Sequence, residues 1–252
     1  MTDKIALVTG GSRGLGRSSA LYLAEKGVGV VLTYLSRSDE ANSVVAKIEN
    51  LGGRAVALQL NTGDTAQFGS FTDRFANTLD RVWGRQSFDY LVNNAGIGIN
   101  ASFAETTEDE FDTLMNIHLK GVFFLTQRLL PLLEDGGRIV NLSSGLARFS
   151  LPGYAAYGTM KGAVEVLTRY MAQELGPRGI AVNAIAPGAI ETDFGGGMVR
   201  DNPQVNQFVA ASTAMGRVGL PDDIGGAIAS LLVGDNQWMT AQRIEVSGGM
   251  NL

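Results

Sequence analysis

The sequence Ile5-Ala-Leu-Val-Thr9-Gly-Gly-Ser-Arg-Gly-Leu-Gly16 predicts a short buried strand, a glycine-rich turn and the start of a helix. The apolar run over 5–9 is typical of a strand buried on both faces. The glycines at 10, 14 and 16 allow a tight turn and a close backbone approach to an anion. The helix expected over 14–26 offers the unpaired N–H groups of its first turn to a pyrophosphate. A glycine-rich turn alone is weak evidence, but its place between a strand and a helix favours dinucleotide binding.

Strands and helices alternate along the rest of the chain. We expect strands over 28–34, 54–60, 88–93, 138–142, 180–185 and 243–246, helices over 39–51, 65–79, 108–133, 154–176 and 222–233, and an irregular segment over 187–215. Most of the strands are continuous apolar runs, which indicates a parallel sheet covered by helices on both faces. The chain shows no linker, low-complexity tract or repeat. The sequence therefore predicts an α/β fold, a doubly wound parallel sheet of seven strands, in one domain over 1–252.

The composition argues against several classes of site. The 252 residues include no Cys and a single His, His118, so we expect neither a cysteine nucleophile nor a metal site. His118 lies two residues after Asn116 and is expected to face elsewhere on that helix, so we expect it to be structural. The net charge of −5 gives no electrostatic footprint for nucleic acid or an anionic membrane. No apolar run approaches the ~20 residues of a membrane span. Without a signal-peptide pattern or cysteines, a cytoplasmic location is the expectation.

The segment Tyr157-Gly-Thr-Met-Lys161 is the strongest candidate for proton chemistry. On a helix, residues four apart share a face, with Cβ atoms about 5–6 Å apart. A free tyrosine titrates near pH ~10, and a fixed cation beside it favours the phenolate and lowers its pKa. The pair could also be an ordinary helical pair, so its weight depends on the residues that surround it.

Small or polar clusters follow almost every expected strand. In open parallel sheets, ligands bind beyond the carboxyl ends of the strands. The clusters are Thr9-Gly10, Tyr34 to Arg37, Asn61-Thr62, Asn93-Asn94-Ala95-Gly96, Ser143-Ser144 and Pro187-Gly188. Any one of them could be a turn, but six on one edge of a sheet indicate a binding site.

The end of the second strand bears on the choice between NAD and NADP. An NAD enzyme usually places an acidic residue there for the ribose 2′-hydroxyl, and Tyr34-Leu-Ser-Arg37 has none. Arg13 lies in the glycine loop, and Ser36 and Arg37 lie near the expected 2′ position. The forked guanidinium suits a phosphate. We therefore expect NADP(H) to be preferred over NAD(H), although both arginines could simply be solvated surface cations.

With these motifs, the chain resembles the short-chain dehydrogenase/reductase family in its single-domain form, whose fold is of the Rossmann type. The resemblance covers nearly the whole chain. It rests on the glycine motif 9–16, Asn93-Asn-Ala-Gly96, Asn116, Ser144, Tyr157-x-x-x-Lys161, and Pro187-Gly188 with Thr192. The tyrosine–lysine spacing is that of the family's ketoreductases, whereas its enoyl reductases place the lysine farther from the tyrosine. Epimerase-like relatives have a different glycine spacing and a longer chain.

The resemblance implies roles for four residues in the reduction of a ketone or the oxidation of a secondary alcohol. Tyr157 is expected to be the general acid, and the base in the reverse direction. Lys161 is expected to lower the pKa of Tyr157 and to bind the nicotinamide ribose. Ser144 would hold the substrate oxygen, although it could be only a turn residue. Asn116 would anchor a water between Lys161 and solvent, although alone it could be an indifferent helical asparagine.

The resemblance also implies which residues contact the cofactor. They are Gly10, Ser12, Arg13, Gly14, Leu15, Gly16, Tyr34, Ser36, Arg37, Asn61, Thr62, Asn94, Ala95, Gly96, Tyr157, Lys161, Pro187, Gly188, Ile190 and Thr192. Asn61 stands at the position where the family often has an aspartate that accepts a hydrogen bond from the adenine. The side-chain amide oxygen of an asparagine can still accept that hydrogen bond. Near the carboxyl terminus, Ala241 and Ser247 replace a glycine and an aspartate that are common in the family. This difference puts in doubt the carboxyl-terminal packing between subunits, not the chemistry.

The expected pocket walls are 97–103, 146–154 and 189–215. Phe149, Leu151, Phe194 and Met198 predict a mainly apolar pocket, and Gly195–Gly197 predicts a mobile lid. No cluster of Arg or Lys lies there to bind a carboxylate or phosphoryl group strongly, and the two exceptions, Arg148 and Arg200, could simply face water. We therefore expect a neutral, apolar ketone or alcohol as substrate. A 3-oxoacyl-carrier-protein reductase is the alternative enzyme, and a non-catalytic dinucleotide-sensing regulator is the alternative of another class. The family resemblance implies a homotetramer paired through the helices over 108–133 and 154–176.

Overall fold

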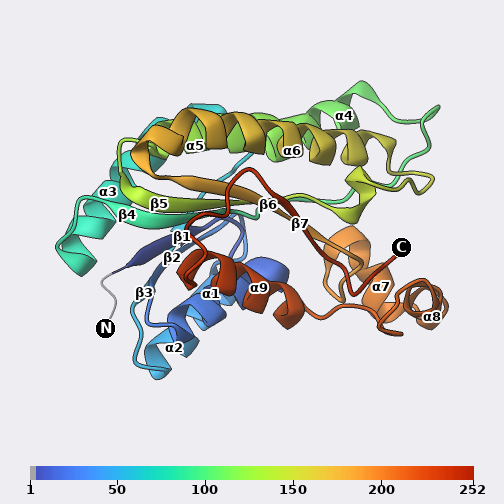
Figure 1. The fold of residues 1–252 in the computed structure, drawn as a ribbon, viewed down its shortest axis with the longest axis horizontal. Coiled ribbons are helices and arrows are strands. Elements are labelled where there is room, and N and C mark those ends of the chain that lie inside the picture. The colour runs from blue at the N-terminus through green and yellow to red at the C-terminus, as the bar shows by residue number, and fades with distance from the viewer. Residues whose placement is uncertain (1–3) are drawn as a thin grey trace.

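The computed structural model describes residues 4–252, which form a seven-stranded sheet in the order β3-β2-β1-β4-β5-β6-β7 (Figure 1). Every adjacent pair of strands is parallel. The strands are β1 (Ile5–Val8), β2 (Gly29–Tyr34), β3 (Ala55–Gln59), β4 (Phe88–Asn93), β5 (Leu133–Leu142), β6 (Ala181–Pro187) and β7 (Arg243–Val246). The predicted doubly wound fold is confirmed.

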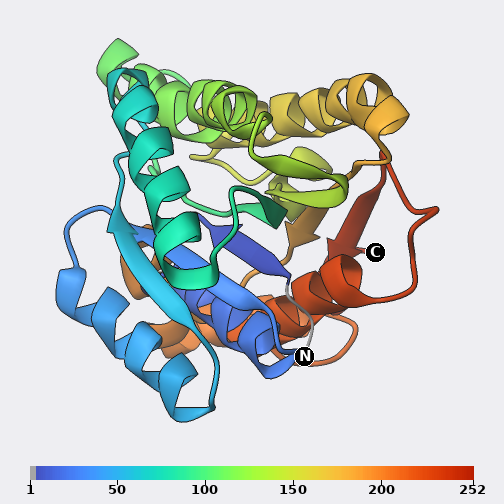
Figure 2. The same cartoon turned by 90° about the vertical axis from the view of Figure 1, so that its left-hand side faces the viewer.

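Helices cover both faces of this sheet (Figures 1 and 2). They are α1 (Gly14–Glu25), α2 (Ser38–Asn50), α3 (Phe68–Trp83), α4 (Glu108–Met115), α5 (Gly121–Leu129), α6 (Ala155–Leu175), α7 (Met198–Asp201), α8 (Pro203–Ala211) and α9 (Pro221–Val233). Helices α1, α2 and α9 pack on one face, and α3, α5 and α6 on the other. Side chains of β1 alternate between the two cores, Ile5 and Leu7 entering one, Ala6 and Val8 the other. This double burial explains why the strand reads as a continuous apolar run.

The chain reverses its direction across the sheet between β1 and β4. Strands β2 and β3 lie on one side of β1, and β4 to β7 lie on the other. In open α/β sheets, the crevice beyond the carboxyl ends at such a reversal is where ligands bind. The glycine loop after β1 and the segment 93–96 after β4 therefore flank the expected binding crevice.

The single helix predicted over 108–133 is wrong in detail. The structure has α4, then a π-helical turn over Asn116–Lys120, then α5. Helix α4 begins with a capping box in which Thr107 and Glu110 exchange side-chain to backbone hydrogen bonds. Helix α5 ends at Leu129, because Pro131 cannot donate a backbone hydrogen bond and disfavours helix in the residue before it. The chain enters β5 at Leu133, earlier than predicted.

The segment 188–220 leaves the sheet after β6 and returns before α9. It contains α7 and α8, whereas it was expected to be irregular. Asn202 caps α8, since its side-chain oxygen accepts hydrogen bonds from the next turn, and Pro203 follows at the first helical position. Two backbone hydrogen bonds close the segment at its base, from Glu191 N to Gly219 O and from Gly219 N to Ala189 O, both 3.0 Å. The segment is thus an excursion with joined ends.

Two kinds of feature are not found in the part of the chain that the structure describes. None of the helices between residues 4 and 252 is long and apolar enough to cross a lipid bilayer. Nor do the same residues bring together three or more side chains that could ligate a metal ion.

Candidate active site

The glycine loop forms a cradle that has no room for side chains at two positions. Gly10 adopts a left-handed conformation with φ +64°, and a Cβ there would lie 2.9 Å from the Cα of Ala95. A Cβ on Gly16 would lie 2.2 Å from the carbonyl oxygen of Gly10. At the N-terminus of α1, Arg13 makes no side-chain cap, and the first turn carries no acidic residue. The N–H groups of this turn are thus available to an anion.

The loop after β4 is fastened to the glycine loop. The Thr9 hydroxyl accepts hydrogen bonds from the backbone N–H groups of Asn94 and Ala95 at 2.9 and 3.0 Å. The Asn94 side chain donates to the carbonyls of Thr9 and Gly10 at 2.8 and 3.1 Å. The predicted cofactor residues 94–96 and 10–16 therefore belong to one rigid unit at the reversal point of the sheet.

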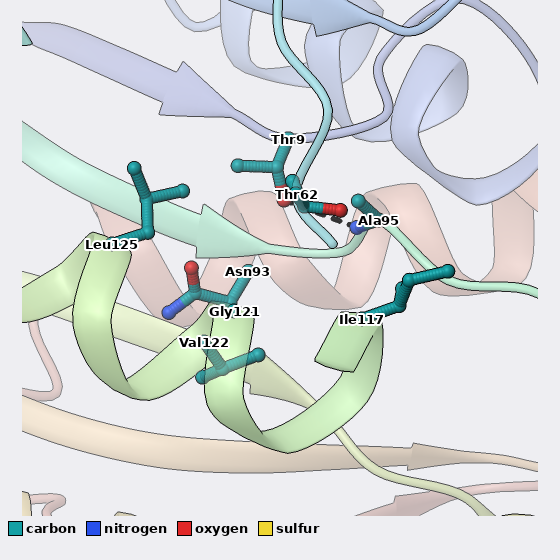
Figure 3. A pocket seen from close by; sticks show the side chains of 8 residues that line it. All are labelled: Thr9, Thr62, Asn93, Ala95, Ile117, Gly121, Val122 and Leu125. Atoms are coloured by element: carbon teal, nitrogen blue, oxygen red, sulfur yellow. Dashed lines mark hydrogen bonds between the residues drawn. The ribbon is translucent and has the colours of Figure 1, made fainter. Parts of the chain in front are cut away.

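A small pocket lies between these loops and the start of α5 (Figure 3). It is lined by Thr9, Thr62, Asn93, Ala95, Ile117, Gly121, Val122 and Leu125. Thr62 and Ala95 belong to the predicted cofactor residues, and Figure 3 shows both side chains at one side of the pocket. Asn61, the neighbour of Thr62, accepts a hydrogen bond from Gly63 N at 3.0 Å through its side-chain oxygen and remains half-buried.

The two arginines expected near the 2′ position are exposed. Arg13 pairs with Asp193 at 3.4 Å, and Arg37 pairs with Glu40 at 3.1 Å. Arg200, Arg13 and Arg37 all contribute to lowering the pKa of Asp193, with a hydrogen bond from Arg200 as the largest cause. Arg13 and Arg37, from separate loops, therefore face the same surface region. Ser36 lies exposed beside them, and Tyr34 is half-buried at the end of β2.

The loop after β6 brings the remaining predicted cofactor residues to the same edge. Pro187 ends β6, and Gly188 N donates to Val246 O at 3.2 Å. Ile190 pairs with Gly219 in an isolated bridge. A Cβ on Gly14 would lie 3.5 Å from the Thr192 side chain. Thr192 is therefore adjacent to the N-terminus of α1.

Tyr157, Ser144 and Lys161 form a buried cluster beyond the end of β5. The Ser144 side chain lies close enough to the Tyr157 hydroxyl to lower the pKa of that phenol. The Lys161 ammonium lies 5.6 Å from the centre of the Tyr157 ring and donates to the Leu142 carbonyl oxygen at 2.7 Å. Tyr157 is 7% exposed and Lys161 is 5% exposed. The helical spacing of four and the end of β5 thus converge as the sequence predicts.

The electrostatics of the cluster differ from the expectation. Burial raises the pKa of Tyr157 above its ordinary value, and the hydrogen bond from Ser144 offsets only part of that shift. Burial also lowers the pKa of Lys161 to about 7. Lys161 is not among the groups that shift the pKa of Tyr157 here, so its expected role in lowering that pKa stays a prediction. The phenol accordingly keeps its proton at neutral pH.

The expectation that His118 faces away from the site is wrong. Its ring stands edge-on to that of Tyr157, with centroids 5.2 Å apart and an interplanar angle of 89°. Asn116, by contrast, is half-buried, and among the described residues no side-chain hydrogen bond joins it to Tyr157 or Lys161. The role assigned to Asn116 stays a prediction. His118 could have been singled out from the sequence because it is the one histidine of the chain. The direction in which its side chain points, however, depends on the π-helical turn.

Apolar side chains surround the approach to Tyr157. The Phe194 ring lies 5.5 Å from the Tyr157 ring and rests against Gly98, where a Cβ would come within 2.7 Å of it. Leu151 and Met198 are exposed, as a wall of an open site requires. Phe149 instead packs into a cluster with Val209, Val218 and Met250, so its assignment to the pocket wall is not supported. Gly195, Gly196 and Gly197 all have left-handed φ values, of 60°, 74° and 77°.

Comparison with known proteins gives matches over nearly the full length. Residues 10–251 match the family described as Enoyl-(Acyl carrier protein) reductase. Trihydroxynaphthalene reductase PfmaI of Pestalotiopsis fici is 34% identical over 98% of this chain and 89% of its own. The reductase LugOII, described as catalysing keto-reduction at C1 during lugdunomycin biosynthesis, has a TM-score of 0.94 and 37% identity over 99% and 98% of the two chains. The angucycline C-6 ketoreductase LanV, solved with bound NADP, has a TM-score of 0.94 and 36% identity over 99% and 96%.

Proposed function

Because the chain belongs to the short-chain dehydrogenase/reductase family, we propose that it is an NADP(H)-dependent ketoreductase in which Tyr157 is the general acid. The observation that carries this proposal is the buried Tyr157 hydroxyl beside the half-buried Ser144, with Lys161 one turn farther along α6. A cofactor-binding domain with no chemistry to perform needs no proton donor at this place. Residues 1–252 would act as one domain that binds both cofactor and substrate.

The residues at the carboxyl edge fit a dinucleotide. The backbone packs so closely at Gly10 and Gly16 that no side chain fits there, and the uncapped start of α1 would hold the pyrophosphate. Arg13 and Arg37 would hold the 2′-phosphate, which favours NADP(H) over NAD(H). Ile190 and Thr192, beside the N-terminus of α1, would hold the nicotinamide end. When bound, the reduced cofactor supplies the hydride.

The chain's own groups would then stabilise the developing negative charge and transfer one proton. Reduction builds negative charge on the carbonyl oxygen, and the hydroxyls of Ser144 and Tyr157 are two donors that can meet it in a largely dry site. Burial keeps Tyr157 protonated because it raises the pKa of that phenol, so the proton is available for transfer. Lys161, whose pKa burial lowers to about 7, would change charge near neutral pH and assist the return of the proton to Tyr157.

We propose a neutral, largely apolar ketone as substrate. Both cations near the expected pocket are already engaged: Arg148 bonds Glu245 and the backbone carbonyls of Met250 and Asn251, and Arg200 bonds Asp193 and Asp201. These partners already neutralise much of the charge that a carboxylate or phosphoryl group would need. The apolar ring of Phe194 beside Tyr157 suits a ring ketone. The ring compounds in the names of PfmaI and LanV also favour such a substrate.

The alternatives are weaker. The matched family is described as an enoyl reductase, but the spacing of Tyr157 and Lys161 and the relatives named as ketoreductases favour carbonyl reduction. A 3-oxoacyl-thioester reductase would use the same catalytic groups, so a substrate panel must separate the two. A cofactor-sensing regulator would not need Ser144, Tyr157 and Lys161 together.

We also propose a cytoplasmic homotetramer. The outer faces of α5 and α6 support it, because Phe123, Phe124 and Tyr170 are 44%, 41% and 65% exposed there. Phe123 and Tyr170 line a groove between the two helices together with Leu130 and Met171. Exposed apolar patches of this kind mark protein contacts. Sedimentation velocity would give the assembly state directly.

The substitution Tyr157→Phe tests the proposed function. It removes only the hydroxyl, so it should lower kcat by at least about 10³-fold, since general acid catalysis and charge stabilisation each contribute a factor of about 10²–10³ or more. The Kd of NADPH, from fluorescence titration, should change little. Tyr22→Phe, which removes the hydroxyl of a half-buried tyrosine on α1, is the matched control and should retain full activity. A Tyr157→Phe enzyme with most of its activity would refute the mechanism.

A further inference from the structure

His118 is a buried titratable group that the proposed mechanism does not use. It is the single histidine of the chain and is 1% exposed. It lies in the π-helical turn over Asn116–Lys120, a kind of irregularity that is frequent at functional sites. Its ring touches Tyr157 and the loop after β4, so it joins three parts of the candidate active site.

The contacts of the ring fix its tautomer. The Nε2 atom lies 2.8 Å from the carbonyl oxygen of Ile97 and 3.3 Å from Ile97 N. A neutral imidazole has one N–H, and the shorter contact is the better hydrogen bond, so Nε2–H donates to the Ile97 carbonyl. Nδ1 is then an acceptor, and it is buried with no hydrogen-bond partner among residues 4–252.

The ring is also held on its remaining sides. A Cβ on Gly96 would lie 2.6 Å from the Cε1 atom of His118, so the backbone of Gly96 lies directly against the imidazole. The edge-on contact with Tyr157 is a favourable arrangement for two aromatic rings. Burial, with the positive charge of Lys161, lowers the pKa of His118 to about 3. The ring is therefore neutral and does not place a second cation near the phenol.

We propose that His118 is a positioning residue that holds the Tyr157 phenol against the loop 96–97, so that the phenol hydroxyl stays directed at Ser144 and the substrate oxygen. This inference rests on the proposed function. The hydrogen bond from Nε2 ties the π-helical turn to Ile97, and the imidazole supports the Tyr157 ring through the edge-on contact from that fixed base. A displacement of the phenol by about 1 Å would cost about 10²-fold in turnover.

Two substitutions separate positioning from simple packing. His118→Leu keeps an apolar side chain but loses the donor to Ile97, and His118→Asn keeps a short amide that can still donate to it. We expect kcat to fall by about 10²-fold in His118→Leu, with the NADPH Kd within about 3-fold of wild type, a change of less than ~0.7 kcal/mol. His118→Asn should recover at least about 10-fold of the loss, because it restores the tie to the loop.

Several outcomes would overturn the proposal. A folded His118→Leu enzyme with kcat unchanged would do so, as would equal losses in kcat and NADPH binding, which indicate general loosening of the loop. Wild-type protein that is inactive with every ketone would refute the proposed function first, and this inference with it. Wild-type activity that depends on Tyr157 but not on His118 would refute this inference alone.

A measurement on the unaltered protein covers the case in which His118→Leu does not fold. Since His118 is the single histidine, nitrogen NMR of tag-free protein reports its ring without ambiguity. We expect one neutral tautomer with the proton on Nε2 and no titration from pH ~5 to ~8, where a free histidine with a pKa of ~6.5 would change charge. Titration near pH ~6.5, or a proton on Nδ1, would overturn the proposal.

Discussion

Replacing Arg13 and Arg37 by alanine should reverse the proposed preference for NADPH, and the size of the effect follows from their present partners. A hydrogen bond to a charged group contributes about 1.5–3 kcal/mol. Each arginine already has an exposed carboxylate partner, Asp193 at 3.4 Å or Glu40 at 3.1 Å, and such surface pairs are worth about 0.2–1 kcal/mol. The net gain on a 2′-phosphate is then about 1–2 kcal/mol for each arginine. Each single substitution should therefore lower kcat/KM for NADPH by about 5- to 30-fold.

The assay measures kcat/KM for NADPH and NADH in parallel with one ketone at low ionic strength. The values for NADH should change by less than about 3-fold, which corresponds to less than ~0.7 kcal/mol, because NADH has no 2′-phosphate. Added salt should weaken NADPH selectivity in the wild type and have less effect in the double variant. Arg81→Ala, an exposed arginine on α3, is the control for loss of surface charge. Equal losses for both cofactors would refute the assignment of Arg13 and Arg37 to the 2′-phosphate.

Two further predictions concern the glycine loop and the buried lysine. Gly16→Ala should weaken NADPH binding by at least about 10-fold in equilibrium titration, since overpacking of about 1–3 kcal/mol must displace the Gly10 carbonyl, 2.2 Å from the new Cβ. Gly69→Ala, with nothing within 4 Å of its Cβ, is the control and should leave binding unchanged. Lys161 has a pKa of about 7 when folded against 10.5 when unfolded, so the unfolded state binds more protons in that window and the lysine's contribution to stability rises with pH. Urea unfolding from pH 7 to 10 should show this rise relative to Lys161→Met, and parallel curves would contradict it.

The architecture could be predicted from sequence because burial acts on each strand separately. Ile5 to Val8 feed both cores in alternation, so the strand is apolar throughout and a helix-sized amphipathic pattern is absent. The cluster of Tyr157, Ser144 and Lys161 could also be predicted, because a spacing of four on a helix and a position after a strand are local facts. The helix at 202–211 could have been found too, since Asn202-Pro203 is a start signal.

The position of His118 could not be predicted in the same way. In a regular α-helix, residues two apart point about 200° away from each other, so placing Asn116 toward the site turns His118 away. The π-helical turn over Asn116–Lys120 adds a residue to one turn and changes the phase of all that follows. No residue pattern in 108–129 marks that turn, which depends on packing against Gly96, Ile97 and Tyr157.

The joined base of the segment 188–220 makes its outer part an exchangeable cassette. The two ends of the segment are held together by the backbone bonds among Ala189, Glu191 and Gly219, and residues 212–215 are bonded to the chain after β7. Phe194, α7 and α8 lie between these fixed parts and could be replaced as one piece by the corresponding residues of another ketoreductase. Such a graft would alter which ketones are accepted, while the groups proposed to handle the hydride and the proton, including Ile190 and Thr192, stay as they are. Selectivity and reactivity in this protein could be engineered as separate parts.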